Sequence, residues 1–464
     1  MQLFVRSLPI LLLLSTLPSF AYAQSAAPRT TSTRTVTLAE VLKAARENPP
    51  AIQVALAALQ RVQAQEQYAR GTYIPRFSIE GGTGISYNDS PYLPISSRNR
   101  YKDLTPAQRE ELGVLPDTVQ STSQNTYGRA VLDYPVLDLG RHFAVKSAAM
   151  NTQAQRSGYG AAQRTAAQDA SELYLRGVAA LALVDDAQVT LERRSSQLSA
   201  VTGLVKAGLR PSVDATRAEI EVTVARYALE TRQIEVLAAG AALAAAIGSD
   251  PTQPVAPAGF DDRVLPVPLE PLPASVVAIE RRPEIDQLEA NLGARRAEHQ
   301  SAIGARLPTA GLIGQGNVSY AAIYDGDGLP GRSLAGSASV YMRWAALDPA
   351  VWRRAKVTRS GVEEARLQLE RALLAVRAEV VEAAYQVQRT RALLEQATQV
   401  LAGAQAARTA QTERYQAGVA SLLELLDAEG LEQSARRMRI EAERDQRVAR
   451  VRLLAACGQI DSLR

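Results

Sequence analysis

Apolar and small side chains recur at heptad spacing through a stretch without internal proline from Pro349 to about Ala417. They occupy two rows, and both rows continue over several heptads. The rows are Leu373, Val380, Val387, Leu394 and Leu401, and Leu369, Val376, Ala383, Thr390, Ala397 and Ala404. This spacing predicts a coiled-coil helix. At a rise of about 1.5 Å per residue it would be on the order of 100 Å long, more than a compact domain requires.

A second, weaker apolar stripe lies beside the first on the same helix. It passes through Leu367, Leu374 and Val381 and reappears at Leu393 and Val400. A helix with two adjacent seams can contact a neighbour on each side, as the staves of a tube do.

A matching stretch lies in the first half of the chain, from roughly Gly140 to Ala207. Each of the two long stretches ends near a glycine and turns back into another helix. Gly208 and Gly418 mark the two turns, and Pro211 is suited to the start of the helix after the first one. We therefore expect two helical hairpins, over residues 140–247 and 349–457.

Four segments change from the helical period to an alternation of apolar and polar residues. They lie near residues 75–88, 126–135, 308–320 and 333–344, and the second is the least regular. Strands of this length with one apolar and one polar face suit a transmembrane β-barrel. Four strands cannot close a barrel, because about eight is the smallest number that does. Open sheet edges are not tolerated in lipid, so several chains must share one barrel, and three copies would supply about twelve strands.

These elements occur twice in the same order. Pro50 corresponds to Pro283 and Pro75 to Pro308 at one offset, and Asp138 corresponds to Asp348 further on. The pattern divides the chain into a first repeat over 24–247, a proline-rich linker over 248–273, a second repeat over 274–457 and a C-terminal tail over 458–464. Repeats of this size indicate an internal duplication of a large unit within one protomer.

The first 23 residues have the order of a cleaved secretory signal: Arg6, an apolar run, and Ala21-Tyr22-Ala23 before Gln24. We expect the mature chain to begin at Gln24 and not to be lipidated, since no cysteine lies near that site. The chain has 1 cysteine, Cys457, so it forms no internal disulfide. No later stretch approaches the roughly 20 apolar residues of a membrane-spanning helix.

Charge and composition argue against several other functions. The chain has 52 Lys and Arg against 48 Asp and Glu, mixed along the helices, which gives little support to nucleic acid binding. His142 and His299 offer no metal-ligand spacing, and the glycines at 311, 314 and 316 lie in an alternating strand rather than in a phosphate-binding loop. We expect no catalytic residues, cofactor or metal, and an enzyme is the weakest interpretation.

Over essentially its whole mature length, the chain resembles the TolC-type outer-membrane efflux and secretion channels, also called outer membrane factors. The resemblance rests on the order, duplication and spacing of several motifs. They are Thr37-Leu38-Ala39-Glu40 with Asn48-Pro49, Pro75 and Pro308 at the strand entries, Tyr134-Pro135-Val136-Leu137-Asp138-Leu139-Gly140-Arg141, Arg282-Pro283-Glu284-Ile285, and Tyr415-Gln416-Ala417-Gly418 followed by Leu425-Leu426-Asp427-Ala428.

The resemblance implies a membrane α+β fold: a homotrimer whose twelve-stranded barrel lies in the outer membrane and continues as a helical tunnel, an α-barrel of antiparallel coiled coils, through the periplasm. A periplasmic adaptor (membrane fusion protein) and an inner-membrane transporter would open its closed inner end. It would be the exit duct of a tripartite efflux pump, or the outer-membrane component of a type I secretion system. A non-channel periplasmic coiled-coil protein with a structural or adaptor role is a further alternative.

The resemblance also implies a periplasmic gate. The gate tyrosine corresponds to Tyr415, and the pore-facing carboxylates correspond to Glu424, Asp427 and, in the first hairpin, Asp214. Ala420 stands where the family has an arginine, and Arg210, at the equivalent place in the first half, is a candidate replacement. Adaptors would contact two turns, Gly208-Leu209 and Gly418-Val419.

The gate carboxylates have two interpretations. Three-fold symmetry would turn each into a ring of three, and such rings favour cations in a narrow pore. Carboxylates are also common in first helical turns because they complement the helix dipole. Tyr341 and Trp344 have two interpretations as well: a membrane-interface belt, or a contact between protomers.

Overall fold

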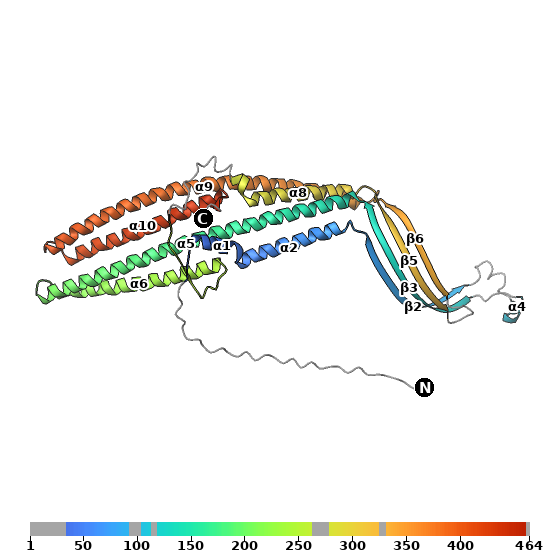
Figure 1. Cartoon of the computed structure of the whole chain (residues 1–464), viewed down its shortest axis with the longest axis horizontal. Coiled ribbons are helices and arrows are strands. Elements are labelled where there is room, and N and C mark those ends of the chain that lie inside the picture. Colours follow the sequence, from blue (N-terminus) through green and yellow to red (C-terminus); the bar gives the residue numbers. More distant parts are fainter. Residues whose placement is uncertain (1–33, 92–103, 113–117, 262–277, 324–330, 461–464) are drawn as a thin grey trace, which may run out of the picture.

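The chain forms an elongated molecule with strands at one end and two helical hairpins at the other (Figure 1). The computed structural model describes residues 34–91, 104–112, 118–261, 278–323 and 331–460. The expected signal segment 1–23 lies outside these residues. Within them, no helix has both the length and the apolar character needed to cross a membrane.

The helices repeat in length between the two halves, which confirms the internal duplication. Helices α5 and α9 have 68 residues each, α6 and α10 have 35 each, and α2 and α8 have 22 each. Their bounds are α1 Leu38–Glu47, α2 Pro50–Gly71, α4 Pro106–Glu111, α5 Leu139–Lys206, α6 Ser212–Ala246, α8 Pro283–Gly304, α9 Pro349–Gln416 and α10 Leu422–Ala456.

The ends of the long helices are set by the same residue types in both halves. The side chains of Asp138 and Asp348 accept hydrogen bonds from backbone N–H groups in the first turns of α5 and α9. At the far ends, Gly208 and Gly418 have φ angles of 67° and 74°, which a residue with a Cβ adopts only at a cost. The expected hairpin turns therefore have a local chemical cause.

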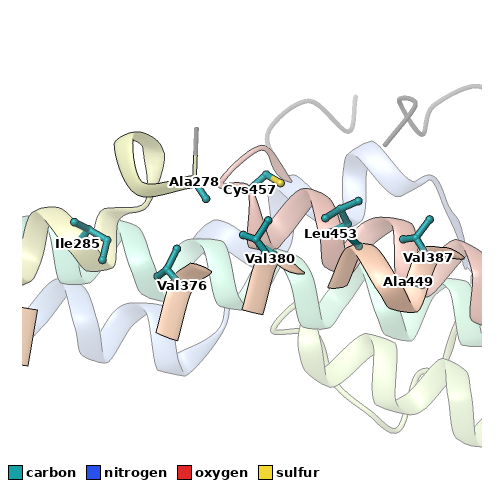
Figure 2. Packing of buried hydrophobic residues seen from close by; sticks show 10 residues of the cluster. Ala278, Ile285, Val376, Val380, Val387, Ala449, Leu453 and Cys457 are labelled. Atoms are coloured by element: carbon teal, nitrogen blue, oxygen red, sulfur yellow. The ribbon is translucent and has the colours of Figure 1, made fainter. Parts of the chain in front are cut away.

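The heptad rows are the internal seam of the second hairpin. Val376, Val380 and Val387 of α9 are buried against Ala449 and Leu453 of α10 (Figure 2). Many other buried positions along the four long helices are alanine, whose small side chain lets the helix backbones approach closely. Long paired helices follow from this composition.

Two arginines fix the carboxyl end of α10. Arg282, which is 3% exposed, donates from Nε to the carbonyl oxygen of Ala456 at 2.7 Å and pairs with Glu379 of α9 at 2.6 Å. Arg164 of α5 donates to the carbonyl oxygen of Ala455 at 3.0 Å and pairs with Glu284. Guanidinium groups complement the free carbonyls and negative dipole of a helix end, so this end of the second hairpin is held firmly against both repeats.

The four long strands form one antiparallel sheet in the order β2-β3-β5-β6. Their bounds are β2 Arg76–Pro91, β3 Thr118–Leu137, β5 Thr309–Ile323 and β6 Gly331–Arg343. Opposite residues share a face, and the register places Glu80 opposite Arg129, Arg129 opposite Asn317, and Asn317 opposite Ala335.

The two faces of this sheet differ in polarity, as the alternation predicted. The polar face carries Glu80, Arg129, Gln315 and Asn317, and Arg129 donates to Gln315 at 2.6 Å. The opposite face carries large apolar side chains that are exposed in the single chain. They are Phe77, Ile79, Leu132, Leu312, Val340 and Met342.

Strand β3 is longer than the alternating pattern indicated. It begins at Thr118, well before residue 126, and pairs with β2 out to Pro91. In the added part nearly every residue of β3 is polar, and the Ser123 hydroxyl lies 2.9 Å from that of Ser86 in β2. A strand whose two faces are both polar has no apolar alternation to reveal it.

The linker expected over 248–273 is not irregular throughout. Its strand β4, Val255–Pro257, pairs in parallel with β1, Arg34–Val36, near the start of the described chain. The Tyr174 hydroxyl of α5 donates to the carbonyl oxygen of Gly259 at 2.6 Å and holds this ribbon against the helices. The expected tail also begins in the core, since Ile460 is 1% exposed and packs with residues of α1, α5 and α10.

Tyr341 does not belong to an aromatic belt on the apolar face. It lies on the polar face, where its hydroxyl donates to Asp133 at 3.1 Å. Trp344, just past β6, is 58% exposed and donates from Nε1 to the carbonyl oxygen of Arg306 at 2.9 Å. Gly311 lies beneath the Tyr341 ring. Because Gly311 has no side chain, the ring occupies the space that a Cβ would take.

We predict that Gly311→Ala destabilises the sheet. The added Cβ would lie 2.7 Å from the Tyr341 ring and 2.8 Å from the carbonyl oxygen of Tyr134, so a loss of about 1–3 kcal/mol is expected in the free energy of unfolding in detergent. Gly314→Ala in the same strand is the control, because no heavy atom lies within 4 Å of its added Cβ. Equal losses for the two variants would contradict this explanation.

Candidate functional site

The expected gate residues lie at the tips of the two hairpins, at the end of the molecule remote from the sheet (Figure 1). A small apolar cluster joins the tips to each other. Val201 of α5 and Ala218 of α6 pack with Leu422 and Leu426 of α10. Residues of the two repeats are therefore adjacent here although they are far apart in sequence.

Arg210 in the turn before α6 and Tyr415 of α9 form a contact between the two hairpin tips. The guanidinium of Arg210 lies 4.5 Å from the centroid of the Tyr415 ring, and its Nη2 donates to the carbonyl oxygen of Tyr415 at 3.2 Å. Burial raises the pKa of Tyr415; the positive charge of Arg210 opposes this shift and the negative charge of Asp214 adds to it. The phenol thus stays neutral and can donate a hydrogen bond.

The turn sequences explain why Arg210 makes this contact. Ala420, at the equivalent place in the second turn, is 4% exposed, and its N–H donates to the carbonyl oxygen of Arg414 at 3.2 Å. Arg210 in the first turn is only partly buried and reaches across to the other hairpin. The arginine missing at 420 thus has a counterpart on the opposite turn.

The three candidate carboxylates lie in different surroundings. Asp214 is 9% exposed in the first turn of α6. Glu424 is exposed, and Ser421 both accepts from its backbone N–H and donates to its carboxylate, each at 3.3 Å. Ser421 is the N-cap residue, and Glu424 lies in the first turn of α10, where the helix-dipole interpretation expects a carboxylate. Asp427 is exposed on the surface of α10. The contacts of the described chain join Arg210 to Tyr415 and bring neither Glu424 nor Asp427 to them.

The two turns each expose an apolar residue directly after the glycine. Leu209 and Val419 are both 70% exposed. They occupy equivalent places in the two repeats. Each hairpin tip therefore exposes one apolar side chain that a partner could contact.

Apolar stripes without a partner run along the outer faces of two helices. On α6, a heptad row is 53–72% exposed in the single chain: Val213, Ile220, Tyr227 and Ile234. On α9, the expected second stripe is exposed as well, with Leu367 at 51% and Leu374 at 64%. Leu393 and Val400 border the groove beside α10 instead, because the step from Val381 to Leu393 is not a multiple of seven.

The sequence did not reveal a set of buried charges just above the tips. Glu429 and Glu432 of α10 are 8% and 1% exposed, and Arg194 of α5 is 5% exposed. Two of their ion pairs join the two repeats, Arg194 with Glu429 and Arg193 with Glu432, and no local pattern identifies these pairs. The sequence held one signal of these buried charges. Glu429 and Glu432 are three residues apart, a spacing that places both on the same face of α10, which here is the inner face of the hairpin.

Comparison with known proteins identifies the chain's relatives. The model of the "Outer membrane efflux protein" family matches residues 41–249 and 275–459. Protein CyaE of Bordetella pertussis is 27% identical over 442 residues, which cover 91% of this chain and 84% of that protein.

Solved structures show the same fold. A membrane protein from Pseudomonas aeruginosa superimposes with a TM-score of 0.71 at 20% identity, covering 94% of this chain and 99% of that one. The open state of the MtrE outer membrane channel of Neisseria gonorrhoeae gives a TM-score of 0.64 at 18% identity, covering 91% and 89%.

We predict a measurable coupling between Arg210 and Tyr415. In a double-mutant cycle of Arg210→Ala and Tyr415→Leu, the free energies of unfolding should be non-additive by about 0.5–2 kcal/mol, since a partly buried cation–π contact is lost only once. A cycle of Arg217→Ala with Tyr415→Leu serves as control, because Arg217 lies on the exposed surface of α6. Additive values for Arg210 would show that the contact does not hold the tips.

Proposed function

The chain belongs to the outer membrane efflux protein family, and on that premise we propose that it is the outer-membrane exit duct of a tripartite efflux pump. One observation carries the proposal. A sheet with an exposed apolar face and a polar face continues directly into helices of 68 residues. A barrel lined by the polar face would lead into a helical tube about 100 Å long.

The edges of the sheet support assembly into a homotrimer. Strands β2 and β6 are the outer strands, and each has one edge unpaired within the described chain. In lipid each unpaired N–H or C=O group costs several kcal/mol, so β2 of one copy must pair with β6 of the next. Three copies would make a closed barrel of about twelve strands, within the range of outer-membrane barrels.

The exposed stripes support the same assembly along the helices. The row on α6 and the row through Leu367 and Leu374 on α9 have heptad spacing, which suits coiled-coil contact with another helix. In a ring of three copies, each hairpin would have a neighbour on both sides, and the stripes would be covered.

The hairpin tips would form the periplasmic gate. Three copies would place three each of Asp214, Glu424 and Asp427 around one axis, and such carboxylate rings favour cations. The Arg210–Tyr415 contact would help to hold the tips closed. The turns at Gly208-Leu209 and Gly418-Val419 would receive the adaptor, with Leu209 and Val419 as its apolar contacts.

The remaining expectations complete the proposal. The chain would extend from the outer membrane into the periplasm. The duct performs no reaction and holds no cofactor, and the adaptor and inner-membrane transporter supply cargo selection and energy. A role in type I protein secretion would use the same duct with a different transporter.

We predict that Tyr227→Glu prevents trimer formation, because it places a charge in the middle of the α6 stripe. The mass of the purified particle in detergent, measured by light scattering, should fall to that of a single chain. Gln233→Glu adds the same charge at an exposed position of α6 outside the stripe and should leave the trimer intact. A Tyr227→Glu protein that remains trimeric would remove this stripe from the proposed interface.

We predict that the trimer in a planar bilayer shows a small, cation-selective conductance, and that Glu424→Ala with Asp427→Ala raises it. Removing the rings weakens both the selectivity and the closure at the tip. Glu219→Ala with Glu413→Ala removes two exposed carboxylates from neighbouring surfaces and is the control. Unchanged conductance in the first variant would remove the gate assignment. A water-soluble monomer without conductance would favour the periplasmic structural protein.

A further inference from the structure

Both tryptophans of the chain lie where the second half of the sheet passes into helix α9 (Figure 1). Trp344 directly follows β6, and Trp352 lies in the first turn of α9. They are 58% and 47% exposed. Arg306 joins them: its carbonyl oxygen accepts from Nε1 of Trp344 at 2.9 Å, and its guanidinium carbon lies 4.7 Å from the centroid of the Trp352 ring. The two indoles are thus held together beside one guanidinium group.

This cluster lies on the apolar side of the sheet. The alternation of β6 puts Trp344 on the same side as Val340 and Met342, which belong to the apolar face. Arg343 lies on the other side, where its guanidinium carbon is 5.7 Å from the centroid of the Tyr341 ring. In a barrel lined by the polar face, the tryptophan cluster would therefore face the lipid.

Two basic residues continue the face of Trp352 along α9. Positions four and seven residues after Trp352 lie within about 40° of it around the helix axis. These positions hold Lys356 and Arg359, and both side chains are exposed. The side of α9 that packs against α8 is a different one, since the buried Thr358 lies there with its hydroxyl 3.0 Å from Nδ1 of His299. The two basic side chains are thus free and adjacent to the tryptophans.

The same face also differs from the one that a second copy would cover. The exposed stripe through Leu367 and Leu374 continues back, in steps of seven, to Ser360. Ser360 is one residue after Arg359, which places the stripe about 100° around the helix from the row of Trp352 and Arg359. Assembly of three copies along the stripe would therefore leave this row accessible.

This basic face has no acidic partner of its own. No residue between Asp348 and Glu363 is acidic. The Asp348 carboxylate accepts hydrogen bonds from the first turn of α9, and Glu363 pairs with Arg366 at 3.1 Å. Within the described chain, neither Lys356 nor Arg359 forms an ion pair. Cations near the start of a helix also oppose its dipole, so an anion beside them would relieve that repulsion as well as form new contacts.

We propose that the face formed by Trp344, Trp352, Lys356 and Arg359 binds an anionic phospholipid of the periplasmic leaflet. The acyl chains lie against the tryptophans, and the phosphate accepts hydrogen bonds from the two basic side chains. By helical rise, Lys356 and Arg359 lie about 6 Å and 10 Å beyond Trp352, and the headgroup layer of a bilayer is about 5–8 Å deep on each side. The inference rests on the proposed function, because it requires the sheet to lie in the outer membrane.

Only the second repeat carries the full set of residues. At the offset that relates Asp138 to Asp348, the four corresponding residues of the first repeat are Tyr134, His142, Lys146 and Ala149. That repeat has no tryptophan and a single lysine at these places. One lipid site in each copy, and three in a trimer, follow from this difference.

Tryptophan fluorescence tests the lipid site, because both tryptophans of the chain belong to it. The full-length protein is reconstituted in phosphatidylcholine vesicles that contain the same small fraction of either brominated phosphatidylglycerol or brominated phosphatidylcholine. Bromine quenches an indole only when the lipid lies next to it. The anionic lipid should bind about 5-fold or more tightly than the zwitterionic one, as expected for basic residues beside a lipid phosphate. Equal quenching by the two lipids would overturn the proposal.

Substitution assigns the preference to its residues. Lys356→Gln with Arg359→Gln should remove the preference for the anionic lipid and leave quenching by brominated phosphatidylcholine unchanged. Arg343→Gln is the control, because it removes a charge at a similar height on the polar side of the sheet, and it should keep the preference. A preference that survives the double substitution, or that is lost equally in the control, would overturn the assignment to Lys356 and Arg359.

Salt gives a second measurement that needs no substitution. About 1 M salt should weaken the preference of the unchanged protein, because it screens charges that lie near water. A preference for the anionic lipid that does not respond to salt would contradict a site built on Lys356 and Arg359.

Quenching by the zwitterionic lipid separates this site from the duct. If both lipids quench equally, the tryptophans meet the membrane as the proposed duct requires, and only the anionic site fails. If neither lipid quenches, Trp344 and Trp352 lie outside the membrane. That result would contradict the placement of the sheet in lipid together with the lipid site.

Discussion

The unpaired edges of the four-stranded sheet are the constraint on which the rest of the molecule depends. One face of the sheet is apolar and suited to lipid, yet among the residues that the structure describes its outer strands β2 and β6 each leave one edge of backbone groups without partners. Water cannot satisfy those groups inside a bilayer. The sheet is stable there only as part of a larger closed barrel, and the helices that continue from it must then stand in a ring.

The helices meet this requirement with two kinds of contact. Within each hairpin, small and branched apolar residues form a seam that excludes water. Opening this seam would expose apolar surface to water, so it stays packed. Between the hairpins of one chain, the contacts above the tips are largely ionic and the apolar cluster is small. In the proposed duct, this division would let the hairpins remain rigid while the boundary between them changes, as a gate at the end of a rigid tube requires.

Much of the fold follows from local sequence signals. The heptads predict α9 and its partner α10, and the glycines predict the turns. Because the chain is duplicated, the same helices and turns are predicted in the first half. The extension of β3 and the pairing of β1 with β4 were missed, because polar strands and short ribbons carry no alternation of their own. The belt interpretation of Tyr341 fails for a different reason, since its position in β6 puts it on the polar face. The buried charges just above the tips were missed for another reason: Arg194 and Glu429 are distant in sequence, and only the packing of two repeats brings them together.

The number of copies around the barrel decides most directly whether this description is right. Single-particle imaging of the full chain, extracted from membranes in detergent, would determine it without any substitution. We expect three copies, with β2 of each paired to β6 of the next and the helices arranged around a continuous central opening. A particle with a single copy, whose sheet edges are covered by its own chain and whose helices enclose no opening, would contradict it.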